Sequence, residues 1–110
     1  MKRQQRRVKS LNVMAQDAVR IASAWLAARL PDRFGPADPT LDENGQVWWV
    51  PVVLSYPGVT VGQIGEISIS ASSGEVVDHT DLNDMKTAGL ALGRKHRAKV
   101  RAAFLRTRNA

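Results

Sequence analysis

The sequence predicts a single α+β domain, an antiparallel three- to four-stranded meander flanked by an N-terminal helix and a long C-terminal helix, in the order α-β-β-β-β-α. Three observations predict it. Apolar residues recur at helical spacing near both ends, the middle of the chain alternates apolar and polar residues, and Gly- or Pro-containing turns separate the alternating runs. Because only two helices are available, we expect both to pack on one sheet face.

Length and composition limit the class of protein. The 110 residues fit one domain covering the whole chain, with a modest core. Cysteine is absent, which excludes a disulfide framework, a thiol nucleophile and a Cys-based zinc site. No apolar run approaches the roughly 20 residues that span a bilayer, and no signal-peptide core follows the basic N-terminus. We therefore expect a cytoplasmic protein that does not contact a membrane.

Charge is distributed unevenly along the chain. The net charge is +6, from 16 Lys and Arg against 10 Asp and Glu. Residues 1–20 and 81–110 are mostly basic, whereas residues 31–80 contain seven acids and one base. We expect residues 1–9 to form a basic arm and residues 81–108 a basic C-terminal helix. Such asymmetry favours an encounter with nucleic acid or with an acidic protein.

The N-terminal helix is expected from about Leu11 to Leu30, with Ser10 as its cap and Pro31 ending it. Its apolar face is a set of residues at helical spacing: Leu11, Met14, Ala18, Ile21, Ala22, Trp25 and Leu26. Residues 31–46 indicate a connecting loop, with one short strand near Pro39–Asp42. The Asn-Gly pair at its end predicts a hairpin.

The meander follows. A long strand is expected from about Gln46 to Tyr56, and residues 56–62 reverse the chain. In residues 63–71 the alternation predicts two faces: Gly65, Ile67, Ile69 and Ala71 on one, and Ile64, Glu66, Ser68 and Ser70 on the other. Gly74 suits a left-handed turn conformation before a last short strand in residues 75–80.

The C-terminal helix is expected from about Leu82 to Arg106, capped by Thr80 or Asp81. Its apolar seam is a series at a spacing close to 3.5: Leu82, Met85, Gly89, Leu92, His96, Val100 and Ala103.

Adjacent tryptophans, Trp48 and Trp49, must point to opposite faces of the long strand. Trp48 belongs with the face assigned to the core. Trp49 shares its face with Val47, Pro51 and Val53, which either is half-covered by loops or is an exposed patch that binds a partner. Pro51 cannot donate to a sheet ladder, so we expect it where the short hairpin partner ends.

No group of residues indicates catalysis or a cofactor, so we do not expect an enzyme. His79 lies near Asp78, Asp81 and Asp84, a pattern that suits helix-capping acids better than a metal site. His96 lies on the apolar seam and is expected to be at least half-buried.

The C-terminal helix carries a run of cations: Arg94, Lys95, Arg97, Lys99 and Arg101, followed by Arg106 and Arg108. They could neutralise phosphates, or they could be a solvated face whose positive charges favour the helix C-terminus.

The strand pair resembles the PepSY family, whose strands read W-x-V and then G-x-I-x-V-D-A-x-T-G-E-V. Residues that match are Trp48, Val50, Gly65, Ile67, Ile69, Ala71, Gly74, Glu75 and Val76. Ser70 and Ser73 replace the family's Asp and Thr. The resemblance covers about residues 12–80 and implies a non-catalytic binding or inhibitory module. The chain departs from the often secreted family in having no signal and in carrying a long basic C-terminal helix. Its segments LPDRF, VPVVLSYPG and VGQIGEI are more similar to small cytosolic bacterial proteins of this fold, some encoded beside PIN-type ribonuclease toxins.

The leading hypothesis is therefore a protein-interaction module, antitoxin-like in that it inhibits a protein partner such as a nuclease toxin. Val47, Trp49, Pro51 and Val53 would supply the apolar contact, and self-association into a homodimer could use the same face. The basic helix would steer the protein toward an acidic surface. The alternative hypothesis is nucleic-acid binding through the basic C-terminal helix.

Overall fold

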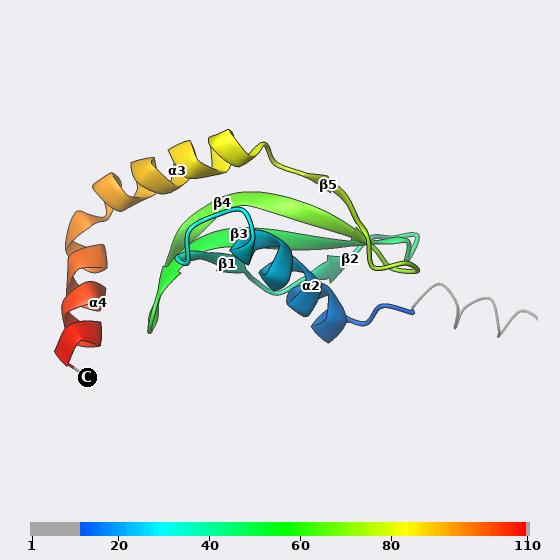
Figure 1. The fold of residues 1–110 in the computed structure, drawn as a ribbon, viewed down its shortest axis with the longest axis horizontal. Helices are drawn as coiled ribbons and strands as arrows, with labels where there is room; N and C mark the ends of the chain where they lie inside the picture. Colours follow the sequence, from blue (N-terminus) through cyan, green and yellow to red (C-terminus); the bar gives the residue numbers. More distant parts are fainter. Residues whose placement is uncertain (1–11, 110) are drawn as a thin grey trace, which may run out of the picture.

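The structure is a computed structural model that describes residues 12–109, with side chains for residues 12–105. It confirms the α+β class and the predicted order of elements (Figure 1). The elements are α2 (Ala15–Ala27), β1 (Phe34–Pro36), β2 (Thr40–Leu41), β3 (Val47–Tyr56), β4 (Val59–Ser70), β5 (Val76–His79), α3 (Leu82–Lys95) and α4 (Arg97–Asn109). The predicted arm of residues 1–9 and the Ser10 cap lie outside the described residues.

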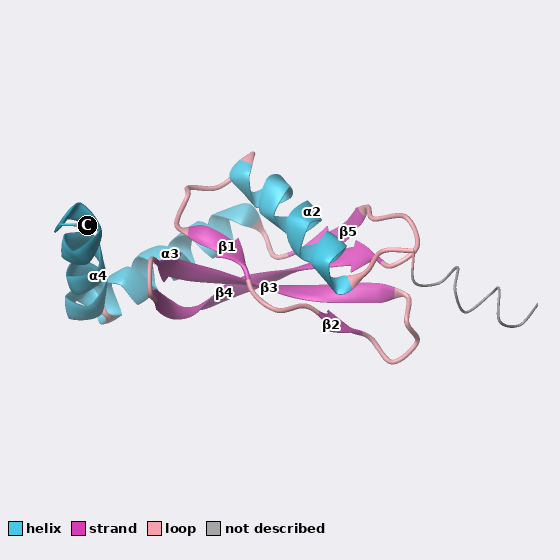
Figure 2. Cartoon of the chain, turned by 90° about the horizontal axis from the view of Figure 1, so that it is seen from below, coloured by secondary structure: helices cyan, strands magenta, loops and turns pink. Residues whose placement is uncertain are grey.

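All strands belong to one antiparallel sheet in the order β1-β3-β4-β5, with β2 also paired to β3. The long β3–β4 hairpin forms its centre and curls strongly toward the turn that joins the two strands (Figures 1 and 2). Gly45 and Gly74 have φ of 70° and 80°, so both predicted turns use the left-handed conformation that glycine favours. The three-residue strand β1 was not predicted, because Gly35 and Pro36 are poor strand formers.

Two register shifts move apolar residues of β4 into the core. One extra β4 residue lies between the pairs Val52–Gly65 and Val53–Gln63, and another between Leu54–Gly62 and Ser55–Thr60. The extra residues are Ile64 and Val61, and both are buried in the core cluster. The prediction that Ile64 faces away from the core is therefore wrong, because strict alternation ends at a bulge.

Pro51 lies between the two short strands that border β3. β2 pairs with Trp48 and Trp49, and β1 pairs with residues 52–54. The Pro51 carbonyl accepts a hydrogen bond from the Ala37 N–H at 2.9 Å, so the Pro51 nitrogen faces the same side, where no strand pairs with it. The expected location, where the hairpin partner ends, is confirmed, although β1 covers the edge again immediately afterwards.

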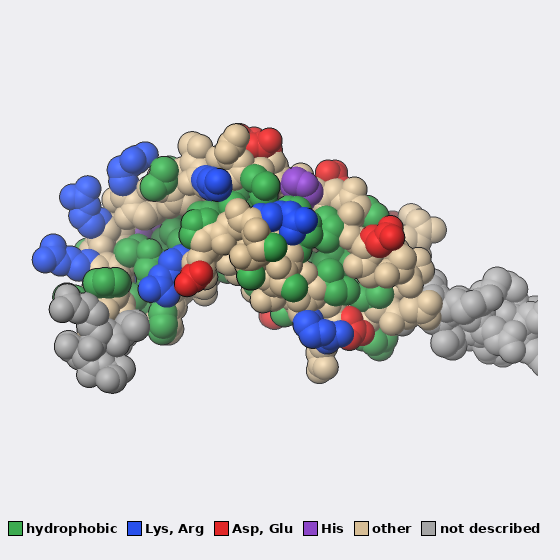
Figure 3. Space-filling model, in the orientation of Figure 1, with side chains coloured by type: hydrophobic (Ala, Val, Ile, Leu, Met, Phe, Trp, Pro, Cys, Tyr) green, Lys and Arg blue, Asp and Glu red, His purple; other side chains and the backbone are tan. Residues whose placement is uncertain are grey.

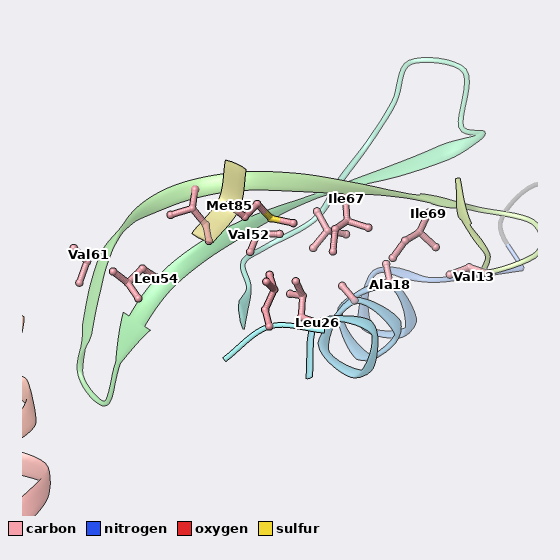
Figure 4. Packing of buried hydrophobic residues seen from close by; sticks show 13 residues of the cluster. Val13, Ala18, Leu26, Val52, Leu54, Val61, Ile67, Ile69 and Met85 are labelled. Atoms are coloured by element: carbon pink, nitrogen blue, oxygen red, sulfur yellow. The ribbon is translucent and has the colours of Figure 1, made fainter. Parts of the chain in front are cut away.

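The core fills the inner face of the sheet, which we define by Val50, Val52, Ile67 and Ile69. α2 contributes Ala18, Ala22 and Leu26, and α3 contributes Met85. Figure 4 shows Leu26, Val52, Ile67 and Met85 pointing toward one another between the sheet and the helices. Both helices thus pack on one face, as predicted.

The start of α2 differs from the prediction. The helix begins at Ala15, where the Met14 N–H donates to the Asp17 carboxylate at 3.0 Å, and Arg20 forms an ion pair with Asp17 at 2.8 Å. Met14 is 56% exposed, so its assignment to the apolar face is wrong. Placed just before the first helical turn, Met14 does not follow the helical periodicity that orients Ala18 and Ala22 inward.

The predicted C-terminal helix is divided in two. Asp81 caps α3 through a hydrogen bond from the Asp84 N–H at 3.1 Å, as expected. At His96 the backbone leaves helical geometry, with φ −115° and ψ 38°, and α4 continues in a new direction (Figure 1). The break brings α4 against the β3–β4 hairpin, where Val100 packs on the core cluster and Ala103 is buried. A straight helix could not follow that curl.

Glycines allow α3 to approach the sheet closely. A Cβ atom at Gly65 would lie 2.8 Å from the Met85 side chain, and one at Gly62 would lie 3.1 Å from Leu92. On the helix side, a Cβ at Gly89 would lie 2.5 Å from the Phe34 ring. Gly93 is different, since a Cβ there would meet nothing within 4 Å.

The two α3 glycines provide a matched test of this packing. Gly89→Ala should lower the free energy of unfolding, because overpacking costs about 1–3 kcal/mol and outweighs the helix propensity that Ala adds. Gly93→Ala should instead raise it by up to about 1 kcal/mol. Urea denaturation of both variants measures the difference, and equal stability of the two would contradict this packing.

The Asp17 carboxylate should make α2 sensitive to acid. The hydrogen bond from the Met14 N–H, then Arg20, lowers the pKa of Asp17 below its usual value. This stabilisation is present above the unfolded-state pKa of about 4 and disappears as pH falls through the lower folded-state pKa. Asp17→Asn should therefore reduce the free energy of unfolding at neutral pH, whereas variant and wild type should converge near about pH 2. A difference that persists in acid would show that Asp17 acts through something other than its charge.

Candidate functional site

The two adjacent tryptophans have separate environments. Trp48 packs against the core from the inner face, and its indole Nε1–H donates to the Val13 carbonyl at 2.7 Å. Trp49 points to the opposite side of the sheet and is 40% exposed. The Trp48 hydrogen bond joins β3 to the segment before α2, so Trp48 holds the fold together and Trp49 is available at the surface.

We call the Trp49 side of the sheet the outer face and define it by Val47, Trp49, Pro51 and Val53. Val47, Pro51 and Val53 are half-buried, and α2 and α3, which pack on the inner face, leave this side uncovered. Across the sheet from Trp49 lies Ser68, which is buried and whose Oγ donates to the Asp78 carbonyl at 3.4 Å. The outer face is therefore an apolar strip bordered by a small polar neighbour.

Acidic groups border Trp49. A hollow of about 160 Å³ beside it is lined by the following residues: Trp49, Glu66, Ser68, Asp78, His79 and Thr80. Its two carboxylates contrast with the cations at the other end of the sheet. α3 begins beside β5, next to this hollow, and runs along the sheet to its basic end at Arg94 and Lys95, where α4 follows (Figure 1). The apolar contact and the basic residues proposed from the sequence are thus on different parts of the molecule.

Neither histidine lies in a group that suggests catalysis. The His79 ring packs on Trp25 with centroids 4.6 Å apart, and the Arg29 guanidinium lies 4.4 Å from the Trp25 ring centroid. This stack fastens α2 to β5. His96 is half-buried at the break between α3 and α4. Within residues 12–105, no three or more His, Asp or Glu side chains are placed to hold a metal ion.

The predicted basic cluster is divided by the helix break. Arg94 and Lys95 end α3, whereas Arg97, Lys99 and Arg101 belong to α4, and all five are exposed. Among the described side chains the single ion pair is that of Arg20 with Asp17, so these cations are not neutralised by neighbours. Because α3 and α4 run in different directions, the cations do not form one straight stripe.

A groove separates the C-terminal helices from the rest of the inner face. Its volume is about 510 Å³, and we call it the C-terminal groove. The lining residues are Pro31, Arg33, Phe34, Leu54, Tyr56, Lys86, Gly89, Leu90, Gly93, Arg94 and Arg97. Figure 3 shows hydrophobic side chains in this hollow with Lys and Arg around it and an acidic side chain at its lower edge. The residues that line the groove are thus apolar or basic, and the acidic side chain lies outside this lining.

Sequence reasoning missed the C-terminal groove, although it placed Arg94 and Arg97 among the candidate basic residues. The lining comes from the segment at residues 31–34, the end of β3 and the helices at residues 86–97. The signals available in the sequence were Leu90, a leucine outside the predicted apolar seam, and a helical glycine, Gly93, that no periodic pattern requires.

None of the helices in the described part of the chain has both the length and the apolarity needed to cross a bilayer. Comparisons of the chain with models of known families, with curated proteins and with solved structures found no match.

Proposed function

We propose that the protein is a non-catalytic interaction module that binds, and thereby inhibits, a protein partner through the outer face. The observation that carries this proposal is the exposure of Trp49 on an apolar strand that the described helices leave uncovered. Tryptophan is enriched among the residues that dominate binding energy, especially where apolar neighbours exclude water around it. Val47, Pro51 and Val53 supply those neighbours.

The surroundings of Trp49 indicate the character of the contact. Interfaces commonly have an apolar centre within a polar rim, and the outer face has this arrangement, with Glu66 and Asp78 beside Trp49. The exposed cations of α3 and α4 would act at a distance by steering an acidic partner toward the protein. The resemblance to PepSY-type proteins supports an antitoxin-like inhibitor, with a nuclease toxin as the partner, and self-association would use the same strip.

Trp49→Ala should weaken association by about 2 kcal/mol or more, roughly thirtyfold, if Trp49 is central to the contact. The measurement is a quantitative pull-down from the native host with mass spectrometry, together with sedimentation of the purified protein to report self-association. Met14→Ala is the matched control, since Met14 is an exposed apolar residue away from the outer face. Unchanged recovery and unchanged self-association with Trp49→Ala, in a correctly folded variant, would refute the role of the outer face.

Nucleic-acid binding is the second candidate function. It is supported by Lys95, Lys99 and Arg101, which are exposed, lack ion-pair partners among the described side chains and lie outside the C-terminal groove. Contacts of cations with phosphates release counterions, so such binding should fall steeply with salt.

Reversing the three charges with Lys95→Glu, Lys99→Glu and Arg101→Glu should abolish binding to random DNA and RNA duplexes and single strands, measured by fluorescence anisotropy across a salt titration. Trp49→Ala should bind them like the wild type. If the wild type shows no binding at low salt, or binding that salt does not weaken, this candidate function is excluded.

A further inference from the structure

The C-terminal groove has the form of a binding site rather than of an imperfection in packing. Its volume of about 510 Å³ lies in the range of roughly 300–1,000 Å³ that ligand sites occupy. Phe34, Leu54 and Tyr56 supply apolar surface from the sheet side, and Leu90 on α3 is 63% exposed although it faces this hollow. A leucine left so exposed beside an apolar surface gains buried area when an apolar side chain enters the groove.

Cations lie on both sides of the groove and along its length. Lys86, Arg94 and Arg97 lie on the helix side. The first two are eight positions apart in α3, a rise of about 12 Å. Arg33 lies on the opposite side with its guanidinium 4.9 Å from the Tyr56 ring centroid. No acid is among the described residues that line the groove. A single anionic head group could meet only part of this array, whereas acidic side chains spaced along a peptide could meet all of it.

Gly93 independently favours an occupant that places a side chain in the groove. A glycine inside a helix costs about 1 kcal/mol relative to Ala, and φ of Gly93 is not positive. A Cβ there would meet nothing within 4 Å, so packing within the described chain does not require glycine. Gly89 contrasts with it, because the Phe34 ring fills the space beside Gly89. Gly93 therefore leaves open space in the groove, where an incoming side chain would approach the α3 backbone.

We propose that the C-terminal groove binds an acidic peptide segment of a partner protein, which inserts apolar side chains beside Leu90 and Gly93 and places its carboxylates against Arg33, Lys86, Arg94 and Arg97. This inference goes beyond the proposed function, because it concerns a separate surface and does not need the outer face. It gives the basic C-terminal helices a defined ligand chemistry.

The segment binds through its side chains and not by adding a strand to β1. Arg33 and Ala37 use their backbone groups to pair with β3, so Phe34 and Pro36 direct theirs to the free edge. Pro36 has no N–H, and the Phe34 N–H is already bonded to the Pro31 carbonyl at 3.1 Å. With no backbone donor left on these two residues, strand addition at this edge lacks half of its hydrogen bonds.

The test uses the full chain and a random 12-residue peptide library displayed on phage. Selection is made on the immobilised wild type, with the Gly93→Leu variant as counter-selection. Leu at this position fills the groove and should preserve or raise the melting temperature, because it replaces glycine in a helix. Ala91→Leu is the matched control, since Ala91 is exposed on α3 and does not line the groove. Synthetic copies of the enriched peptides are then titrated by fluorescence anisotropy.

We expect enriched peptides with net negative charge and one or more large apolar residues. Their affinity should fall roughly tenfold or more in Gly93→Leu and in the double variant Lys86→Glu, Arg94→Glu, and should be unchanged in Ala91→Leu and Trp49→Ala. Replacing the acids of the peptide by amides should also weaken binding, increasingly so at low salt.

Four results would overturn the proposal. Two concern the peptides: no enriched peptide that Gly93→Leu weakens, or enriched peptides without acidic residues. Sodium dodecanoate that binds in a Gly93-dependent way while the peptides do not would assign the groove to a small amphipathic anion. A dimer in sedimentation that Gly93→Leu dissociates would assign it instead to a second copy of this chain. Weaker recovery of the partner from the native host in Trp49→Ala, with peptide binding unchanged, concerns the outer face alone, so the two proposals fail separately.

Discussion

The close approach of α3 to the sheet is the contact on which the rest of the structure depends. Gly65 and Gly62 on β4 leave room for Met85 and Leu92, and Gly89 on α3 leaves room for the Phe34 ring. Because the helix lies this near to β4, Met85 reaches the centre of the core, where it meets Leu26 of α2 and Val52 of β3. This contact also sets the direction of α3, and therefore where α4 begins and which side of the C-terminal groove carries the cations of the two helices.

The curl of the β3–β4 hairpin explains why the C-terminal region is two helices. Two register shifts bend β4 and turn Ile64 and Val61 into the core, which leaves the end of the hairpin strongly bent. A bent sheet end cannot pack along a straight helix. The break at His96 lets Val100 and Ala103 follow the bend, and the apolar seam predicted through both helices is buried or half-buried on either side of the break.

The inner and outer faces carry different chemistry. The inner face is filled by α2 and α3 except at the C-terminal groove, which is lined by apolar and basic residues. The outer face is an apolar strip with acids beside it, centred on Trp49. Both surfaces suit protein contacts, and the separation of charge between them matches the acidic middle and basic end of the sequence. A partner whose charge complements one surface would be repelled by the charge of the other.

The sequence by itself determined the type and order of the main elements, a cap at Thr80 or Asp81, the glycine turns and the burial of Ile67, Ile69 and Met85. These features depend on local propensity and on hydrophobic period, which short stretches of sequence contain. It also separated Trp48 from Trp49 correctly, because neighbouring residues of a strand must face opposite ways. Only the tertiary structure decided the strand β1, the inward turn of Ile64, the helix break at His96 and the C-terminal groove. Each of these results from contacts between segments far apart in the chain, such as Phe34 with Gly89, and no local pattern specifies which segments will meet.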